Sequence, residues 1–309
     1  MQDPETPGAL ALVGPGRAGA TVAAALQERG WRVTAVAGRS PEAGSTLDVA
    51  AILGAEPVGV GEAGREADLV VLATPDAAIR EAAIAVAPSV PAGSLLVHLA
   101  GSLGLAVFHP VRRFRGDLRF GALHPLVSIP SVTVGLDRLP GAWCAVAGDP
   151  RVRGLAAQLG MHAFEVADAD RPRYHAAAAV AANHLVALLG QVERLARAVG
   201  VPFEAFLPLV RASVENTAEL GPRAALTGPV ARGDQGTVAR HLASLPRDER
   251  AAYRALAREA LRLVDRQNAL LAALLEEQAG DDEPVVPRAR RHRPRRSVAP
   301  VDETPVEGS

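Results

Sequence analysis

The chain has 309 residues, of which 49% are hydrophobic and 22% charged, so it can bury a sizeable core and exceeds the usual length of one domain. A disordered or fibrous protein is excluded. The formal net charge of −1 gives no basic field for nucleic acid or a membrane, and we expect neither partner. The sequence contains no lysine, which excludes a Schiff base, a phosphate-loop lysine and a catalytic lysine acid.

A single cysteine, Cys144, cannot form an internal disulfide, and no Cys/His cluster has zinc spacing. We therefore expect no metal site and a reducing location. Residues 1–5 lack the basic start of a signal peptide, and no apolar run reaches membrane-spanning length without a charge or a break. These features favour a cytoplasmic protein.

The first half alternates short apolar runs with helical patterns, which predicts βαβ units and a mostly parallel sheet. The runs at 69–73 and 95–97 are continuously apolar, as expected of strands that helices cover on both faces. We predict an α/β fold in which residues 1–170 form a doubly wound Rossmann domain. The strands are expected at Ala9–Val13, Arg32–Ala37, 68–74, 95–100, 142–147 and 163–167.

From about residue 171 the pattern changes to long Ala/Leu/Arg helices, expected at 174–199, 203–220 and 248–277. We predict an all-helical substrate and dimerisation domain over 171–280. The segment 281–309 is rich in Pro, Arg and acids, and we expect a disordered tail. Its arginine cluster at 288–296 is flanked by acids and is interpreted as solvated.

A G-x-G-x-x-G motif directly follows the first apolar strand and opens an Ala-rich helix. Gly14 suits the tight turn, Gly16 lets a pyrophosphate approach the backbone, and Gly19 lets helix and strand pack closely. The helix N-terminus supplies free N–H groups to the anion. The predicted dinucleotide-binding turn consists of Gly14, Pro15, Gly16, Arg17, Ala18 and Gly19.

The second strand ends without the acid that would bond the ribose of NAD. Arg39 and Ser40 stand there instead and suit a 2′-phosphate, so we predict NADP(H), with an ordinary surface arginine as the alternative. Thr74 and Pro75 follow the run at 68–74 at the edge where such sheets bind ligands. Asp76 is expected to be a helix N-cap.

Several further motifs, taken in order, resemble the Rossmann-like proteins that carry domain of unknown function 2520. They cover nearly everything except the tail and read GPGRAG at 14–19, LATPD at 72–76, HLAGS at 98–102, GALHPL at 121–126, YHAAA at 174–178 with Asn183, and LTGPVARGD at 226–234 with Thr237 and His241.

The resemblance implies an NADP-dependent oxidoreductase related to ketopantoate reductase, pyrroline-carboxylate reductase and prephenate dehydrogenase, with a helical domain that mediates dimerisation. Two positions depart from the family pattern, because Ala100 and Ala182 stand where serine is expected. Ser102 is a candidate to supply the first hydroxyl from a shifted position. By the same resemblance, His124 corresponds to the histidine that lies at the substrate hydroxyl in prephenate dehydrogenase.

His124 follows an apolar stretch and precedes Pro125, which favours an extended backbone at the edge that faces the cleft. We select it as the general acid, and the alternative is a histidine that caps a strand end. His98 lies inside an apolar strand and is interpreted as a hydrogen-bonded core histidine.

His175, Ala179 and Asn183 fall at i, i+4 and i+8 on one helix face among alanines. Asn183 is a candidate for the substrate or carboxamide contact and His175 for a catalytic role; packing between domains or across a dimer is the alternative. Arg232 is a candidate clamp for a substrate carboxylate, although an Arg232–Asp234 pair that only fixes the loop is equally compatible.

The leading hypothesis is an NADPH-dependent reductase of a small 2-keto acid, with ketopantoate favoured by resemblance. The alternatives are a dehydrogenase of the prephenate or pyrroline-carboxylate type, and a non-catalytic NADP-binding sensor. The expected partners are a small-molecule substrate and a second copy of the chain.

Overall fold

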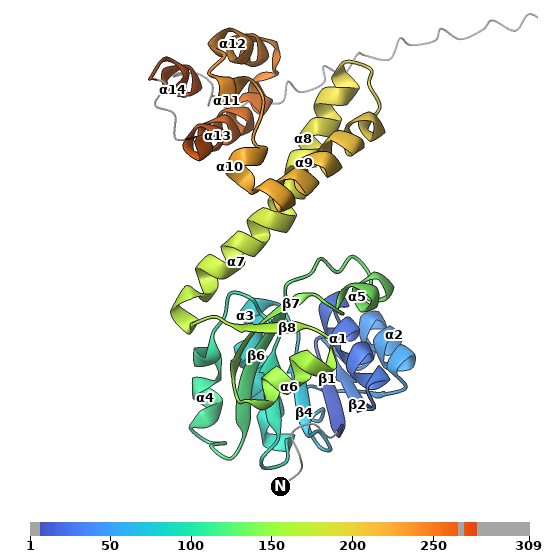
Figure 1. Ribbon diagram of the computed structural model, residues 1–309. Helices are drawn as coiled ribbons and strands as arrows, with labels where there is room; N and C mark the ends of the chain where they lie inside the picture. The colour runs from blue at the N-terminus through green and yellow to red at the C-terminus, as the bar shows by residue number, and fades with distance from the viewer. Residues whose placement is uncertain (1–6, 265–268, 277–309) are drawn as a thin grey trace, which may run out of the picture. The chain divides into compact units, whose positions relative to one another are not determined.

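The computed structural model describes residues 7–264 and 269–276 and divides the chain into two compact units, 1–190 and 191–309 (Figure 1). The predicted tail at 281–309 lies outside the described residues. The domain boundary near residue 170 stays a prediction, and the first helix after it belongs to the first unit.

The first unit is built on one eight-stranded sheet in the order β3-β2-β1-β4-β5-β6-β7-β8. All neighbouring strands are parallel except the antiparallel pair of β6 and β7. The predicted doubly wound α/β fold is therefore confirmed. The strands are β1 (Ala9–Val13), β2 (Arg32–Ala37), β3 (Glu56–Val58), β4 (Leu69–Leu72), β5 (Leu95–His98), β6 (Arg119–Pro125), β7 (Trp143–Gly148) and β8 (His162–Glu165).

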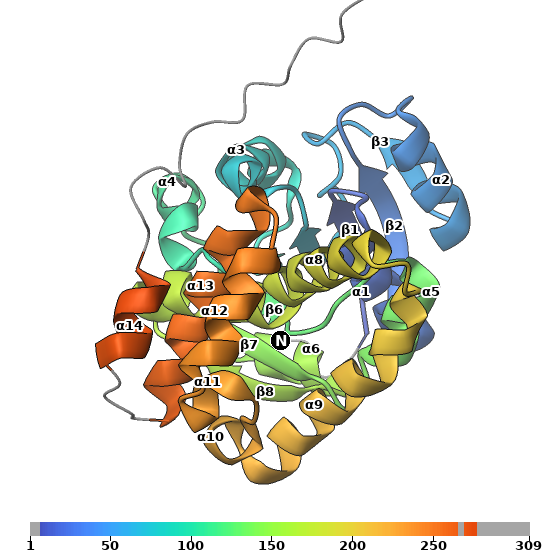
Figure 2. The ribbon, with the colours of Figure 1, turned by 90° about the horizontal axis from the view of Figure 1, so that it is seen from above.

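Helices cover both faces of this sheet, with α1 and α6 on one side and α3 and α4 on the other (Figure 2). The helices of the first unit are α1 (Arg17–Glu28), α2 (Gly44–Leu53), α3 (Asp76–Val86), α4 (His109–Arg112), α5 (Val132–Arg138), α6 (Arg151–Gln158), α7 (Arg171–Ala179) and the start of α8 (Leu185–Ala198).

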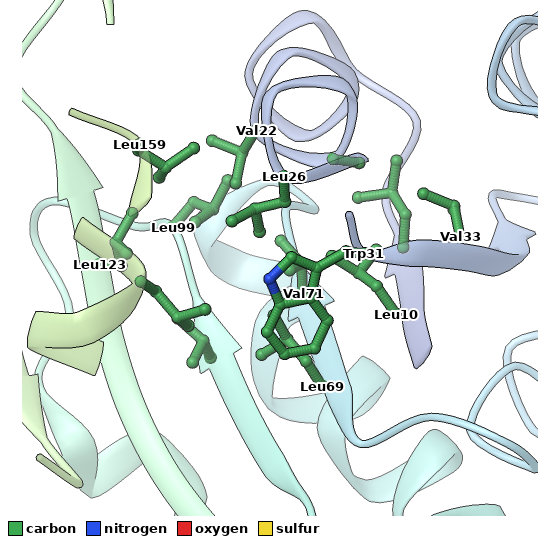
Figure 3. Close-up of a cluster of buried hydrophobic side chains, with 14 of the residues drawn as sticks. Leu10, Val22, Leu26, Trp31, Val33, Leu69, Val71, Leu99, Leu123 and Leu159 are labelled. Carbon is green, nitrogen blue, oxygen red and sulfur yellow. The ribbon is translucent and has the colours of Figure 1, made fainter. Parts of the chain in front are cut away.

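The two faces bury separate cores because successive side chains of a strand point to opposite sides. In β1, Leu10 and Leu12 enter the core under α1, while Ala11 and Val13 enter the core under α3. Figure 3 shows the first of these cores, in which the Trp31 ring lies among aliphatic side chains. Burial of this kind, at about 25 cal/mol per Å² of apolar surface, holds the strand ends in place.

The second unit is helical, as predicted. Its helices are the end of α8, α9 (Leu207–Leu220), α10 (Pro222–Ala225), α11 (Pro229–Arg232), α12 (Gln235–Ser244), α13 (Arg247–Val264) and α14 (Ala269–Leu275). A small core around Val238 and Leu271, both 0% exposed, joins the helices α11 to α14. Buried Glu249 accepts hydrogen bonds from the Arg194 guanidinium at 2.5 and 3.1 Å, which ties α13 to the end of α8.

One continuous helical stretch, 168–198, is long and apolar enough to span a membrane by length and composition alone. The sequence expectation that no such run exists is therefore wrong. Only 6% of its most apolar window is buried inside the chain. Helices that pack in soluble proteins pass the same test, so the property by itself assigns no membrane.

Candidate functional site

The carboxyl ends of β1, β4, β5 and β6 lie next to one another because these strands are neighbours in the sheet. Gly14 follows β1, Thr74 follows β4, Gly101 follows β5, and His124 lies near the end of β6. Open α/β sheets bind ligands at this edge. The chain therefore places its Gly-rich turn and its candidate histidine along one continuous rim of the first unit.

The glycine motif forms the turn that its sequence predicts. Gly14 has a φ of +103°, and a Cβ there would lie 2.5 Å from the backbone of Ala73 and Thr74. A Cβ on Gly19 would lie 2.5 Å from the Gly14 carbonyl oxygen, so any larger residue would push α1 away from β1. Around Gly16 there is open space, which leaves its backbone accessible to a ligand.

A cavity of about 760 Å³ opens at this turn. Beside it, the Thr74 hydroxyl is buried without a hydrogen-bond partner, so it is available to a polar ligand. Arg39 lines the cavity, whereas Ser40, Arg17, Ala18 and Gly19 do not. The lining includes Gly14, Pro15, Gly16, Gly38, Arg39, Ala43, Ser45, Thr74 and Pro75.

The N-terminus of α2 faces the same cavity. Its N-cap is Ala43, and no side chain caps the first turn of this ten-residue helix. Uncapped N–H groups and the positive end of a helix dipole favour an anion, and the exposed Arg39 adds a full positive charge. The residues present therefore fit a dinucleotide with an additional phosphate.

A second cavity, of about 500 Å³, is formed by the end of β6, the loop after it and one face of α7. Three residues that the sequence predicts to be catalytic, His124, His175 and Asn183, line this cavity. Its wall also contains Tyr174, which the sequence analysis quotes in a motif without assigning it a role. The remaining lining is mostly small or apolar, namely Pro125, Leu126, Val127, Ser128, Ala177, Ala178, Ala179, Ala181 and Ala182.

His124 and Tyr174 form a hydrogen-bonded pair, with 2.7 Å between His124 Nδ1 and the phenol oxygen. Burial, followed by the charges of His175 and Arg171, lowers the pKa of His124 to about 4. Burial raises the pKa of Tyr174 to about 12. Both side chains are therefore neutral at neutral pH, and each carries one transferable proton.

Gly101 lies directly against the two imidazoles. A Cβ at this position would be 2.5 Å from His175 Nδ1 and 2.7 Å from His124 Nε2. His175 Nδ1 is buried and has no hydrogen-bond partner. Only glycine allows this approach, so Gly101 belongs to the site although the sequence analysis assigns it no role.

Residues Val180–His184 form a π-helical turn between α7 and α8. Such turns are rare and frequent at functional sites. The extra residue changes the angular spacing that the sequence argument assumes, yet Asn183 still reaches the cavity that His175 lines. Asn183 is exposed, and Ala182 lines the cavity beside it.

Ser102 lies outside both cavities. Its hydroxyl donates a short hydrogen bond to Asp76 Oδ2. Asp76 is the first residue of α3 rather than its N-cap, which is Pro75, so the expected capping role is wrong. Ala100 is 6% exposed and lies in the core under α3.

His98 is fully buried, as expected of a core histidine, but neither ring nitrogen has a partner at ordinary hydrogen-bond geometry. Burial, with the nearby charge of Arg171, lowers its pKa to about 4, while its contact with the Gly104 backbone acts in the opposite direction. The imidazole is accommodated as a neutral ring, whose centroid lies 5.6 Å from that of Phe108.

Arg232 lies in the second unit, at the end of α11, and is exposed. Gly233 adopts the left-handed conformation that ends this helix, with φ +76°. Asp234 then caps α12 by accepting hydrogen bonds from the backbone and hydroxyl of Thr237 at 3.0 and 2.8 Å. The cap accounts for Asp234, and the role of Arg232 stays a prediction.

No cluster of metal-binding side chains occurs among the residues that the structure describes.

The depressed pKa values of His98 and His124 predict an acid-sensitive first unit. Between about pH 6.5 and about pH 4, the two histidines are protonated in the unfolded chain but remain neutral in the folded protein. The free energy of unfolding therefore falls as the pH falls through this window, by about 1.4 kcal/mol per pH unit for each imidazole.

Urea unfolding, followed by the fluorescence of Trp31 and Trp143, measures this loss, since both tryptophans lie in the first unit. The variant His124→Gln is expected to lose about half of the dependence of its free energy of unfolding on pH, because only His98 then contributes. If the free energy of unfolding changed equally with pH in the native protein and in His124→Gln, the depressed pKa of His124 would be contradicted.

Two protein-family models match the chain. Residues 6–125 match the Rossmann-like domain, and residues 144–260 match the domain of unknown function (DUF2520). No curated protein matches the sequence closely enough to count as a relative.

Solved structures share the fold. A proposed NADP oxidoreductase from Bacteroides fragilis is 24% identical, with a TM-score of 0.72 over 84% of this chain and 100% of that one. Protein TM1727 from Thermotoga maritima is 23% identical, with a TM-score of 0.56 over 86% and 95%. Plasmodium falciparum pyrroline carboxylate reductase with bound NADP is 14% identical, with a TM-score of 0.53 over 84% and 95%.

These identities establish a shared fold. The two family matches confirm the resemblance that the motifs indicate, to Rossmann-like proteins that carry domain of unknown function 2520.

Proposed function

We propose that the protein is an NADPH-dependent reductase of a small 2-keto acid, with ketopantoate favoured by the resemblance of its motifs. The observation that carries the proposal is the His124–Tyr174 pair, which lines a cavity on the same sheet edge as the Gly-rich turn. Structures that share the fold include a reductive aminase from Aspergillus terreus in complex with NADPH, 17% identical with a TM-score of 0.53 over 87% and 92% of the two chains.

The turn at 14–19 and the N-terminus of α2 bind the cofactor. Gly14 and Gly16 let the pyrophosphate approach the backbone, while Arg39 and the uncapped N-terminus of α2 bind the 2′-phosphate. The Thr74 hydroxyl supplies a further polar contact. When bound, NADPH supplies the hydride for the carbonyl carbon.

The His124–Tyr174 pair supplies the proton. Hydride addition to a ketone leaves an alkoxide that must be protonated as it forms. His124 is neutral, so it acts through the proton of its neutral ring, in concert with the phenol to which it is bonded. Asn183 orients the carbonyl, and His175 completes the polar wall of the cavity.

Two further residues have roles outside the cavity lining. Arg232, in the second unit, stays a candidate clamp for a carboxylate because its planar guanidinium matches that group. Ser102 acts through Asp76, with which it shares a hydrogen bond at the edge between β4 and β5.

The nucleotide preference rests on Arg39. We expect Arg39→Ala to weaken NADPH binding by about 10- to 100-fold, because it removes a charge-assisted contact, and to leave NADH binding unchanged. Fluorescence titration of both nucleotides measures the effect. Arg32→Ala, at the start of β2, the strand that Arg39 follows, is the matched control. Equal affinity of the native protein for NADH and NADPH would defeat the assignment.

Proton transfer by the His124–Tyr174 pair is tested at His124. We expect His124→Ala to lower kcat by roughly 10²–10⁴-fold, the range for general acid–base catalysis, with NADPH affinity nearly unchanged. His109→Ala, on the exposed start of α4, is the control. Near-normal turnover in His124→Ala would transfer the role to His175 or to water, and loss of NADPH binding would mark His124 as structural.

The substrate class is tested with a panel of 2-keto acids and cyclic imines at fixed NADPH. Turnover of a keto acid supports the proposal. Turnover of an imine or of prephenate in preference to a keto acid would favour the alternative dehydrogenases. NADPH binding without turnover would favour a sensor, an interpretation that the alanines at positions 100 and 182 support because the family pattern has serine there.

We also propose that the protein is a cytoplasmic homodimer. In the first unit, Val180 and Val186 are 56% and 69% exposed, and in the second unit Leu209 and Leu220 are 66% and 59% exposed. Apolar side chains this exposed favour burial against a second copy. Light scattering at micromolar concentration is expected to give twice the chain mass, and a monomer would contradict the proposal.

A further inference from the structure

Arg171, the first residue of α7, is the most unusual charged side chain of the first unit. It is 0% exposed, and none of its three guanidinium nitrogens is hydrogen-bonded. Its ion partner is Asp168, with 3.9 Å between Nε and Oδ1. Asp168 is itself 46% exposed and accepts a hydrogen bond from the Leu105 N–H at 2.7 Å, so it compensates the guanidinium weakly.

Such burial is costly for folding. Moving a guanidinium out of water costs several kcal/mol, and a long contact with a half-exposed carboxylate returns little of it. An apolar residue of similar length would fill the same space without that cost. A buried cation that does not stabilise the fold calls for a role in chemistry.

The position of Arg171 points to that role. Arg171, Tyr174 and His175 lie at i, i+3 and i+4, so one face of α7 presents all three to the sheet edge. Tyr174 and His175 line the cavity, while Arg171 does not. The spacing of three residues along α7 places Arg171 next to Tyr174 on one helix face, and its charge acts on Tyr174 and His124.

We propose that Arg171 is a positioning residue whose buried charge makes Tyr174 the proton donor of the site. The inference rests on the proposed reductase function and deepens it. In a chain without lysine, this arginine takes the electrostatic role of a cation beside a catalytic phenol. It acts through Tyr174 and touches no substrate.

Reduction of the carbonyl group takes one proton from Tyr174. As hydride adds to the carbonyl carbon, the C=O π pair forms a bond to the Tyr174 proton, which leaves a hydroxyl group and a phenolate. The adjacent guanidinium stabilises the phenolate. The phenolate then regains one proton from solvent by way of His124, the ring to which the phenol is bonded.

Several groups face the Tyr174 phenol. Burial raises its pKa to about 12, and Arg171 acts in the opposite direction. Cys144 adds no charge at neutral pH, because burial raises the pKa of its thiol to about 12. The other groups around Tyr174 are the rings of His124 and Phe164, and Asp168 acts on it through Arg171.

The test measures the ionisation of Tyr174 directly. The chain has two tyrosines, so Tyr253→Phe leaves Tyr174 alone. Labelling with 3,5-difluorotyrosine brings the phenol pKa into a range where the protein stays folded, and fluorine NMR reads its midpoint. In this background, Arg171→Gln is expected to raise the midpoint by about one pH unit or more, since an opposite charge nearby is removed.

Three further variants establish the sign and the cause of the shift in the Tyr174 midpoint. Asp168→Asn removes the partial compensation of the guanidinium and is expected to lower the midpoint by a few tenths of a unit. Arg173→Gln removes an arginine from the same helix whose side chain is 88% exposed, and is expected to leave the midpoint unchanged. Arg171→Lys keeps the charge and is expected to restore most of the native midpoint.

The proposal is overturned if Arg171→Gln titrates as the native protein does, or if Arg173→Gln shifts the midpoint equally. Should Arg171→Gln not fold, Asp168→Asn decides the question, because an unchanged or raised midpoint there contradicts the proposal. None of these readouts needs substrate or turnover. A correct shift in a protein that reduces no keto acid would therefore refute the proposed function while leaving the electrostatic inference intact.

Discussion

Partial burial of polar side chains at the carboxyl edge of the sheet is the constraint on which the site depends. In water, the imidazole of His124 would be partly charged at neutral pH. Buried at the end of β6, it is neutral and bonded to a neutral phenol. The same burial leaves the Arg171 charge poorly screened, so that one cation can act on the whole pair. The proposed proton transfer and charge stabilisation thus both depend on the partly buried pocket at the edge of the sheet.

Small residues make this pocket possible. Gly101 lets the imidazoles of His124 and His175 contact the backbone that follows β5. Gly14 lets the turn after β1 lie against the backbone that follows β4. On the facing helix, a series of alanines and a π-helical turn leave room beside Tyr174 and His175. The positions that look least specific in the sequence therefore shape the cavity.

Local patterns predicted the parts of the fold that depend on neighbouring residues. The alternation of β1 and β2 with helices, and the strand–turn–helix context of Gly14, were readable because each feature spans a few residues. The pair of His124 and Tyr174 joins positions 50 residues apart, and no local pattern encodes such a contact. Two strands escaped prediction. β3 has three residues and begins with Glu56, while β6 begins with Arg119, contains Gly121 and ends at Pro125, residues that interrupt its apolar run.

Arg171 shows a different limit. Arginine is almost always exposed, so composition and periodicity assign it to the surface, and only the packing around it shows that it is buried. His98 was expected to have hydrogen-bond partners for the same statistical reason and has none at ordinary hydrogen-bond geometry. Both exceptions lie at the same edge of the sheet, which is where a functional site is expected to break the general rule.

The most direct test of the account is a crystal structure of the protein with NADP⁺ and a 2-keto acid. The account predicts that the nicotinamide ring lies at the cavity lined by His124, Tyr174 and Asn183, with the keto oxygen within hydrogen-bond distance of the Tyr174 hydroxyl or the His124 ring. A nicotinamide ring directed away from this cavity, or a keto acid bound beyond reach of both side chains, would contradict it.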